Sequence, residues 1–231
     1  MNRLLLVVGF TAALSACNSG DNTEAGNSAD TASHSAHAGT SGDTAASAQP
    51  NNTATISGQS MMGIMQRNMD QMKSMESTGS PDKDFAAMMK THHMGAMEMA
   101  QLEVAQGTDA QLKQMAQKML EAQQKEMTQL DAFLSSTNNK DTVTAQRGSS
   151  AFHQQVMSHM NNMKMDMNHS GSVDDQFAQM MIPHHQGGID MAKAYLKSGA
   201  QDQKLKTIAN KIASDQQKEI NELQAWINKN K

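Results

Sequence analysis

Cysteine, aromatic residues and basic charge are scarce in this chain. Their scarcity excludes an internal disulfide and argues against a nucleic-acid-binding surface. The 231 residues include one cysteine, Cys17, so no disulfide can form within the chain. Aromatic residues make up 3% of the sequence and the formal net charge is −4, which leaves neither stacking side chains nor a basic stripe for nucleic acid. The longest apolar run, residues 4–14, is too short to cross a membrane as a helix. We therefore expect no nucleic-acid partner.

The N-terminus resembles the signal sequence of a bacterial lipoprotein. A basic start precedes the apolar run, and residues 14–17 (LSAC) resemble a lipobox, whose cysteine is lipidated after residues 1–16 are removed. An ordinary cleaved signal peptide is the alternative, but the only cysteine stands at the lipobox position. Asn18 resembles the sorting signal for the outer membrane of Gram-negative cells. We therefore expect a cell-envelope protein, anchored through lipid on Cys17 to the periplasmic face of the outer membrane.

Residues 17–57 are predicted to form a disordered tether. They consist mainly of Ser, Thr, Ala, Gly, Asn and Asp, with almost no large apolar side chain. Such a segment cannot bury enough apolar surface to offset the entropy lost on folding. Five histidines have no assigned role in the predictions below, namely His34 and His37 in the tether and His153, His159 and His169 further along the chain.

Methionine, by contrast, is in large excess. The chain has 23 methionines, and all but Met1 lie between Met61 and Met191. Methionine specifies core packing poorly, whereas its thioether sulfur is a soft ligand that selects Cu(I) and, by the same argument, Ag(I). The excess therefore favours a soft-metal protein, with a methionine-rich core as the simpler alternative. Both interpretations apply to a stripe at helical spacing, formed by Met61, Met65, Met69, Met72 and Met75.

Two adjacent histidines, preceded by two methionines, occur twice at an offset of 92 residues. Residues 88–93 read MMKTHH and residues 180–185 read MMIPHH. At helical spacing, His92 and His184 fall on an apolar face, with the adjacent histidine at its flank. A histidine there is usually a hydrogen-bonded core residue, but the repetition and the flanking methionines favour metal ligands. We predict a copper site on each copy, for Cu(I) with Cu(II) or Ag(I) as alternatives, built from His92, His93, Met88, Met89, Met97, Met99, His184, His185, Met180, Met181 and Met191.

The apolar periodicity predicts an all-α protein made of two copies of one unit. The first copy covers residues 58–136 and the second residues 151–231, joined by a polar linker over 137–150. In each copy a helical hairpin follows a methionine-rich helix, and the two hairpins pack as a four-helix bundle. The methionine-rich helices are expected over residues 60–77 and 151–168, and the hairpins over residues 82–135 and 174–229.

Polar residues recur on the last helix of each copy. Gln123 and Glu126 return as Gln216 and Glu219 at an offset of 93 residues. A buried polar side chain needs a partner, and the histidine pairs are the candidates. We therefore predict that these four residues hydrogen-bond the histidine ligands.

Pro183 distinguishes the second copy from the first, which has Thr91 at this position. A proline inside a helix removes one backbone hydrogen bond and clashes with the carbonyl one turn earlier, so we expect a kink just before His184. Gly187 and Gly188 weaken the helix further and let an ion or another backbone approach. The two metal sites are therefore not expected to bind with equal affinity.

Residues 181–192, MIPHHQGGIDMA, resemble the signature of the domain of unknown function 305 family. The resemblance extends to residues 216–220 (QQKEI) and covers residues 60–229 in two copies. It implies a ferritin-like helical bundle and copper binding outside the cytoplasm. The first copy departs from this pattern at residues 90–91 and 94–95, where it has Lys-Thr and Met-Gly.

The predicted function is binding rather than catalysis. A lipid-anchored bundle would sequester copper or pass it to a copper export or resistance protein, for metal tolerance or homeostasis. A ferritin-like metal oxidase is the enzyme alternative, but di-iron bundles use Glu-x-x-His pairs, and no glutamate here has a histidine three residues later. A methionine-rich surface that binds partner helices is a third alternative, which leaves the repeated histidine pairs unexplained.

Overall fold

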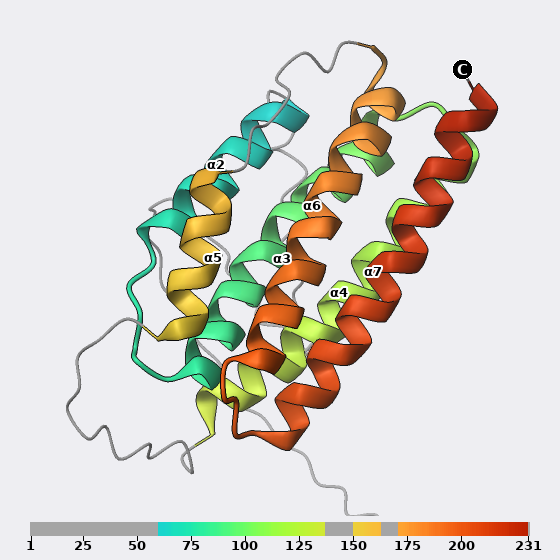
Figure 1. Ribbon diagram of the computed structural model, residues 1–231. Helices are drawn as coiled ribbons and strands as arrows, with labels where there is room; N and C mark the ends of the chain where they lie inside the picture. The colour runs from blue at the N-terminus through green and yellow to red at the C-terminus, as the bar shows by residue number, and fades with distance from the viewer. Residues whose placement is uncertain (1–59, 137–149, 163–170, 231) are drawn as a thin grey trace, which may run out of the picture. The chain divides into compact units, whose positions relative to one another are not determined.

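In the computed structural model, which describes residues 60–136, 150–162 and 171–230, every regular element is an α-helix (Figure 1). The prediction of an all-α fold is confirmed. The expectations for the signal sequence, Cys17, the tether and most of the linker concern residues outside the described ranges. The helices are α2 Met61–Ser74, α3 Pro81–Gln106, α4 Ala110–Ser135, α5 Ala151–Asn162, α6 Val173–Lys197 and α7 Gln203–Asn230.

Each of these helices begins at a serine or aspartate whose side-chain oxygen accepts a hydrogen bond from a backbone N–H three residues later. The capping residues are Ser60, Ser80, Asp109, Ser150, Ser172 and Asp202. Gly79 and Gly171 precede two equivalent caps, and their φ angles of 82° and 134° are ones that other residues rarely adopt. The turns before α3 and α6 therefore require glycine. α6 continues across Pro183 as one helix.

α3 and α6, the helices that carry the histidine pairs, lie side by side at the centre of the bundle (Figure 1). α4 packs along α3 and α7 packs along α6, which gives the predicted four-helix bundle. α2 and α5 pack against α3 and α6 on the side away from α4 and α7. The two copies are therefore joined through their histidine helices. Among the described helices, none combines the length and apolar character needed to cross a membrane.

Two equivalent aspartates tie the histidine helix of one copy to the hairpin turn of the other. Asp174, in the first turn of α6, accepts a hydrogen bond from the backbone N–H of Asp109 at 2.8 Å. Asp82, in the first turn of α3, accepts one from the backbone N–H of Gln201 at 3.2 Å and one from the Tyr195 hydroxyl. Each carboxylate accepts hydrogen bonds from backbone N–H groups at the start of a helix, and these N–H groups have no acceptor within that helix. These contacts fix how far α3 and α6 are shifted along each other.

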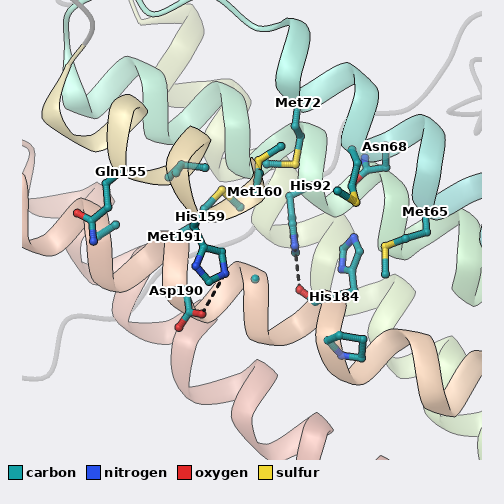
Figure 2. A pocket seen from close by; sticks show the side chains of 15 residues that line it. Met65, Asn68, Met72, His92, Gln155, His159, Met160, His184, Asp190 and Met191 are labelled. Atoms are coloured by element: carbon teal, nitrogen blue, oxygen red, sulfur yellow. Dashed lines mark hydrogen bonds and ion pairs between the residues drawn. The ribbon is translucent and has the colours of Figure 1, made fainter. Parts of the chain in front are cut away.

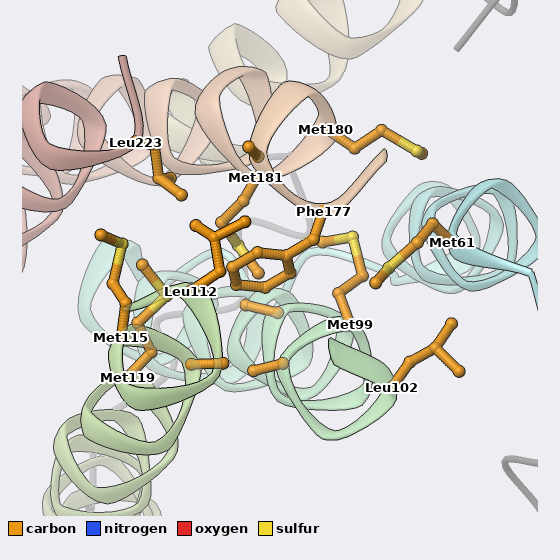
Figure 3. Packing of buried hydrophobic residues seen from close by; sticks show 14 of the residues in the cluster. Met61, Met99, Leu102, Leu112, Met115, Met119, Phe177, Met180, Met181 and Leu223 are labelled. Carbon is orange, nitrogen blue, oxygen red and sulfur yellow. The ribbon is translucent and has the colours of Figure 1, made fainter. Parts of the chain in front are cut away.

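Apolar side chains form two clusters, and the histidines lie between them. One cluster surrounds Phe177 and is rich in methionine (Figure 3). The other surrounds Phe85, whose ring stacks on Tyr195 with the ring centroids 4.1 Å apart. Along α3 and α6, residues of one cluster precede each histidine pair and residues of the other follow it. A buried layer of four imidazoles therefore separates the two apolar clusters.

Candidate metal centre

The imidazoles of His92 and His184 meet where α3 contacts α6. Their ring centroids lie 3.9 Å apart, and the ring planes are inclined by 34°. His92 Nε2 lies 3.0 Å from the backbone carbonyl oxygen of His184, and because a carbonyl only accepts, this nitrogen carries the proton. The lone pair of His92 is therefore on Nδ1, which has no hydrogen-bond partner within the described residues. Neither ring nitrogen of His184 has such a partner there.

Both of these rings are uncharged at neutral pH. Burial lowers the pKa of His92 to about 3, with a further contribution from His93 and His185, while the hydrogen bond to the His184 carbonyl opposes the shift. Burial also holds the pKa of His184 well below its ordinary value, and His92 adds to this effect. A neutral imidazole has the lone pair that a metal ion requires, so no proton has to leave these rings when a metal binds.

A cavity of about 130 Å³ opens beside the two rings, and α2, α5 and α6 provide most of its wall (Figure 2). His92 and His184 line it together with five methionines from three helices. Among the described residues, no group of three or more His, Cys, Asp or Glu is placed to hold a metal ion, so a site here depends on thioether sulfur. The methionines are Met65, Met69 and Met72 on α2, Met160 on α5 and Met191 on α6.

The cavity adjoins Gly187 of the second copy, while asparagine fills the equivalent place in the first. Asn68 packs on Gly95 so closely that a Cβ on this glycine would lie 2.4 Å from Asn68 Cγ. Asn68 also donates a hydrogen bond to a backbone carbonyl of α3 at 2.6 Å, which holds it in place. The residue that corresponds to Asn68 is Met160, and a Cβ on Gly187 would meet only His92 Nε2, at 3.7 Å. The two copies therefore have equivalent helices but differ in the free space beside the histidines.

Of the methionines predicted as ligands, Met191 lines the cavity and the others do not. Five of them fill the apolar clusters as leucine would, and a ligand role for these five stays a prediction. Met88 and Met89 belong to the cluster around Phe85, and those around Phe177 are Met99, Met180 and Met181. Met97 is half-buried on α3.

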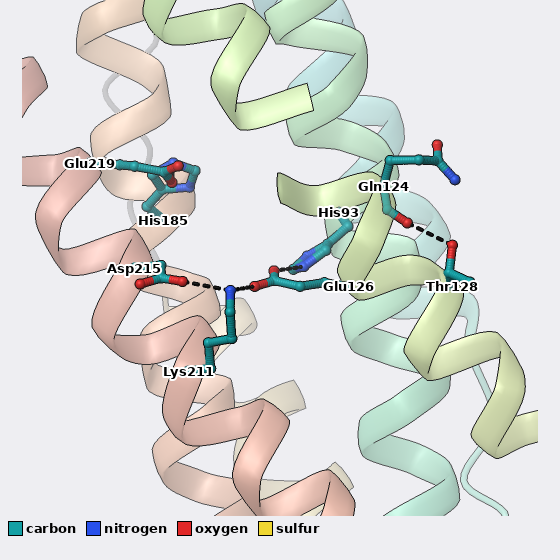
Figure 4. A network of polar contacts seen from close by, with 8 residues as sticks. All are labelled: His93, Gln124, Glu126, Thr128, His185, Lys211, Asp215 and Glu219. Atoms are coloured by element: carbon teal, nitrogen blue, oxygen red, sulfur yellow. Dashed lines mark hydrogen bonds and ion pairs between the residues drawn. The ribbon is translucent and has the colours of Figure 1, made fainter. Parts of the chain in front are cut away.

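His93 and Glu126 form a buried pair within the first hairpin (Figure 4). His93 Nε2 lies 2.9 Å from Glu126 Oε2. Lys211 on α7 donates to the other carboxylate oxygen at 3.0 Å, which links the two hairpins. Burial would raise the pKa of Glu126, but hydrogen bonds from His93 and Lys211 hold it below its ordinary value. His93 is therefore held by a carboxylate, and it does not line the cavity.

His185 and Glu219 make the equivalent contact in the second hairpin, with poorer geometry. His185 Nε2 lies 2.8 Å from Glu219 Oε2, but the two groups are not aligned for a hydrogen bond. The Glu219 side chain is 19% exposed, against 6% for Glu126. His185, like His93, lies outside the cavity wall, so a ligand role for the two flanking histidines stays a prediction.

Gln123 and Gln216 do not make the predicted hydrogen bonds to histidine. Both amides are buried, and neither their oxygen nor their nitrogen has a partner among the described residues. A Cβ on Gly188 would lie 2.2 Å from Gln216 Oε1 and 2.9 Å from His92 Cε1. Gln216 therefore packs closely on the glycine. This prediction was wrong because the nearby glutamates, rather than the glutamines, reach the flanking histidines.

The cavity residues that were not among the predicted site residues include His159 and Met160. Both lie on α5, the predicted counterpart of the first methionine-rich helix, where His159 had no assigned role. The offset of 92 residues carries the missing signal, because it aligns Met160 with Asn68 and His159 with Arg67. A comparison of the two copies position by position would therefore have identified α5 as part of the cavity.

The fold and the cavity define a helical-bundle protein with a pocket lined by methionine and histidine, to which both tandem copies contribute. The chain belongs to the family described as domain of unknown function (DUF305), whose model matches residues 21–134 and 82–227. The two overlapping matches agree with the repeat. The resemblance recognised in residues 181–192 is thereby confirmed.

Several solved structures are similar to this chain at low sequence identity. CopM in the Cu(I)-bound form is 23% identical, over 64% of this chain and 96% of CopM, with a TM-score of 0.45. For CopM in the Cu(II)-bound form these values are 24%, 63%, 95% and 0.43. A DUF305 fragment from Deinococcus radiodurans is 19% identical, over 67% of this chain and 99% of the fragment, with a TM-score of 0.46. No curated protein matches the chain.

Proposed function

We propose that this protein binds Cu(I), and Ag(I) as its chemical analogue, in the cavity beside His92 and His184. The observation that carries the proposal is the set of donors gathered there, five thioethers and two neutral imidazoles. Soft thioether ligands select Cu(I), whereas harder ions prefer carboxylate and water. Nδ1 of His92 and the ring nitrogens of His184 have no competing partner among the described residues, so they are available as ligands.

Copper storage or transfer is the role that these donors support best. Methionine side chains are flexible and polarizable, so an ion can exchange one thioether for another without a rearrangement of the helices. In this proposal the protein stands in the cell envelope, held at the outer membrane by lipid on Cys17, and passes its ion to a copper export or resistance protein. The N-terminal residue pattern supports the location and the anchor.

A competition titration against a Cu(I) chelator tests the pocket. In a Cys17→Ser background, leucine at Met65, Met160 and Met191 removes three of the five thioethers and conserves side-chain volume. We expect the affinity for Cu(I) and Ag(I) to fall at least about 100-fold, or about 2.8 kcal/mol. An unchanged affinity would contradict the proposal.

A second triple variant provides the matched control. Met88, Met99 and Met181 lie in the apolar clusters and not in the cavity wall. Their replacement by leucine changes as many sulfur atoms, and we expect the affinity for Cu(I) to stay the same. A similar loss in both triple variants would mean that the methionines act through general packing.

Oxygen consumption separates metal binding from metal oxidation. An oxidase would turn over repeatedly when supplied with Cu(I) or Fe(II). For a binding protein we expect no consumption beyond what the bound metal itself accounts for. Sustained oxygen uptake that the pocket triple variant abolishes would favour the enzyme alternative.

A further inference from the structure

The mouth of the cavity carries donors that the thioether site does not use. His159 on α5 and Asp190 on α6 both line the cavity, and their side chains are 51% and 35% exposed. His159 Nε2 lies 3.7 Å from Asp190 Oδ2 (Figure 2). This separation is longer than a hydrogen bond, so the two groups lie opposite each other without being joined by one.

The equivalent pair in the first copy is chemically different. The offset of 92 residues aligns His159 with Arg67 and Asp190 with Glu98. Arg67 donates to Glu98 Oε2 at 2.8 Å. A guanidinium group has no lone pair to offer a metal ion, whereas a neutral imidazole has one. The cavity is therefore lined by a histidine of the second copy at the position where the first copy has arginine.

A neighbouring glutamine holds the carboxylate of Asp190 in position. The Gln186 amide donates to Asp190 Oδ1 at 3.0 Å, and the other oxygen, Oδ2, is the one nearest His159. Nitrogen and oxygen ligands bind a transition-metal ion at about 2.0–2.2 Å, so a pair that shares one ion lies roughly 3 Å apart. A small side-chain rotation at these partly exposed residues therefore brings both donors to one ion.

We propose that His159 and Asp190 form an outer site for a divalent ion, with Cu(II) the preferred one, at the mouth of the cavity. Imidazole and carboxylate bind divalent transition metals, and among the first-row ions Cu(II) binds such ligands most tightly. This inference rests on the proposed function and extends it, because it assigns a different ion and different residues to the outer end of the same cavity. Two protein donors and water complete the coordination, so the affinity is modest.

Paramagnetic broadening in NMR spectra locates this ion whatever other histidines the chain contains. We expect substoichiometric Cu(II), added to the full chain, to broaden the amide signals of Gln155, His159 and Asp190 first. The variant His159→Arg copies the first-copy pair and should abolish this local broadening. Asp190→Asn should weaken Cu(II) binding at this site by at least about tenfold, whereas the equivalent change Glu98→Gln should not.

Titration of the same variants with Ag(I) separates this inference from the proposed function. Loss of local Cu(II) broadening in His159→Arg, with the affinity for Ag(I) unchanged, would support the outer site. Persistent broadening in that variant, or wild-type broadening centred elsewhere, would overturn the outer site and leave the Cu(I) pocket standing. Failure of the wild-type protein to bind Ag(I) would overturn the proposed function instead. Circular dichroism of each variant confirms that the helical fold is retained.

Discussion

Glu103 and Tyr195 occupy equivalent positions in the two copies, and each interacts with an aspartate of the other copy. Glu103 interacts with Asp174, which caps the turn after α3, and Tyr195 interacts with Asp82, which caps the turn after α6. The Tyr195 hydroxyl donates a hydrogen bond to Asp82. Glu103 is fully buried, and its carboxylate oxygens accept no hydrogen bond within the described residues. An ionised carboxylate cannot donate a hydrogen bond. Glu103 must therefore carry a proton to donate to Asp174 as the Tyr195 hydroxyl donates to Asp82. Burial, with a hydrogen bond to Asp174, raises the pKa of Glu103 from 4.5 to about 8.

Glu103 is therefore predicted to make the stability of the fold depend on pH. Between its unfolded pKa of 4.5 and its folded pKa of about 8, the native state keeps a proton that the unfolded state releases. The contribution of Glu103 to the free energy of unfolding falls as pH rises through this window, by at most about 1.4 kcal/mol per pH unit. Below pH 6.5 the buried neutral His92 and His184 contribute in the opposite direction, so the net fall is expected between pH 6.5 and about 8. Urea denaturation at several pH values measures it.

Glu103→Gln tests the assignment, because an amide donates to Asp174 at any pH. The fall in stability between pH 6.5 and about 8 should flatten in this variant. Glu121→Gln, at an exposed position on α4, serves as the control and should leave the slope as it is. If Glu103→Gln retains the full slope, the buried proton belongs to another group.

Tyr195→Phe should destabilise the fold by about 1–3 kcal/mol, because it removes a donor from a buried carboxylate. The ring stack on Phe85 is retained, so the loss reports on the hydroxyl alone. Chemical denaturation with an unchanged dependence on denaturant concentration would isolate this effect. An unchanged stability would mean that the backbone N–H groups of Gln201 and Asp202 satisfy Asp82 by themselves.

Alanine at the two adjacent glycines of α6 should have opposite effects. At Gly188 the new Cβ would lie 2.2 Å from Gln216 Oε1, and we expect a loss of about 1–3 kcal/mol from overpacking. At Gly187 the nearest atom would be 3.7 Å away, so the higher helix propensity of alanine should stabilise the fold by up to about 1 kcal/mol. Thermal unfolding of both variants measures the difference, and equal losses would refute the close packing at Gly188.

Under the proposed function, Ag(I) should raise the unfolding temperature of the protein, because the pocket exists only in the folded chain. At a free concentration 100 times the dissociation constant, the gain is about 2.7 kcal/mol, or roughly 5–10 °C for a chain of this size. A thiol chelator should reverse the shift. The variant with leucine at Met65, Met160 and Met191 should show little of it, and a full shift there would place the ion elsewhere.

Local signals in the sequence predicted most of the fold. Helix caps such as Ser80 followed by proline, and the period of the apolar residues, are properties of a few neighbouring residues, so they can be read directly. The predicted hairpins over residues 82–135 and 174–229 agree with α3–α4 and α6–α7 to within about one residue at each end. The contact of His92 with His184 involves residues 92 positions apart, and no local pattern encodes it.

The lining of the cavity was harder to predict than the fold. Helical spacing places Met88 and Met160 equally well on inner faces, and only the packing of six helices decides which side chain borders a cavity. Because methionine serves both as a core residue and as a ligand, composition does not separate the two uses. The predicted partnership of Gln123 with histidine failed for a related reason, because a neighbour on the same helix, Glu126, reaches the ring instead.

The hydrogen bond from His92 to the His184 carbonyl has a consequence for chains that carry a single copy of this unit. The proton on Nε2, and with it the orientation of the free nitrogen, is set by a backbone oxygen that the other copy supplies. An isolated first copy lacks that oxygen and ten of the fifteen residues that line the cavity. A chain with one copy would have to pair with a second molecule to supply a comparable wall, so its affinity for an ion would vary with protein concentration. Under the proposed function, tandem fusion makes metal binding independent of the concentration of the protein itself.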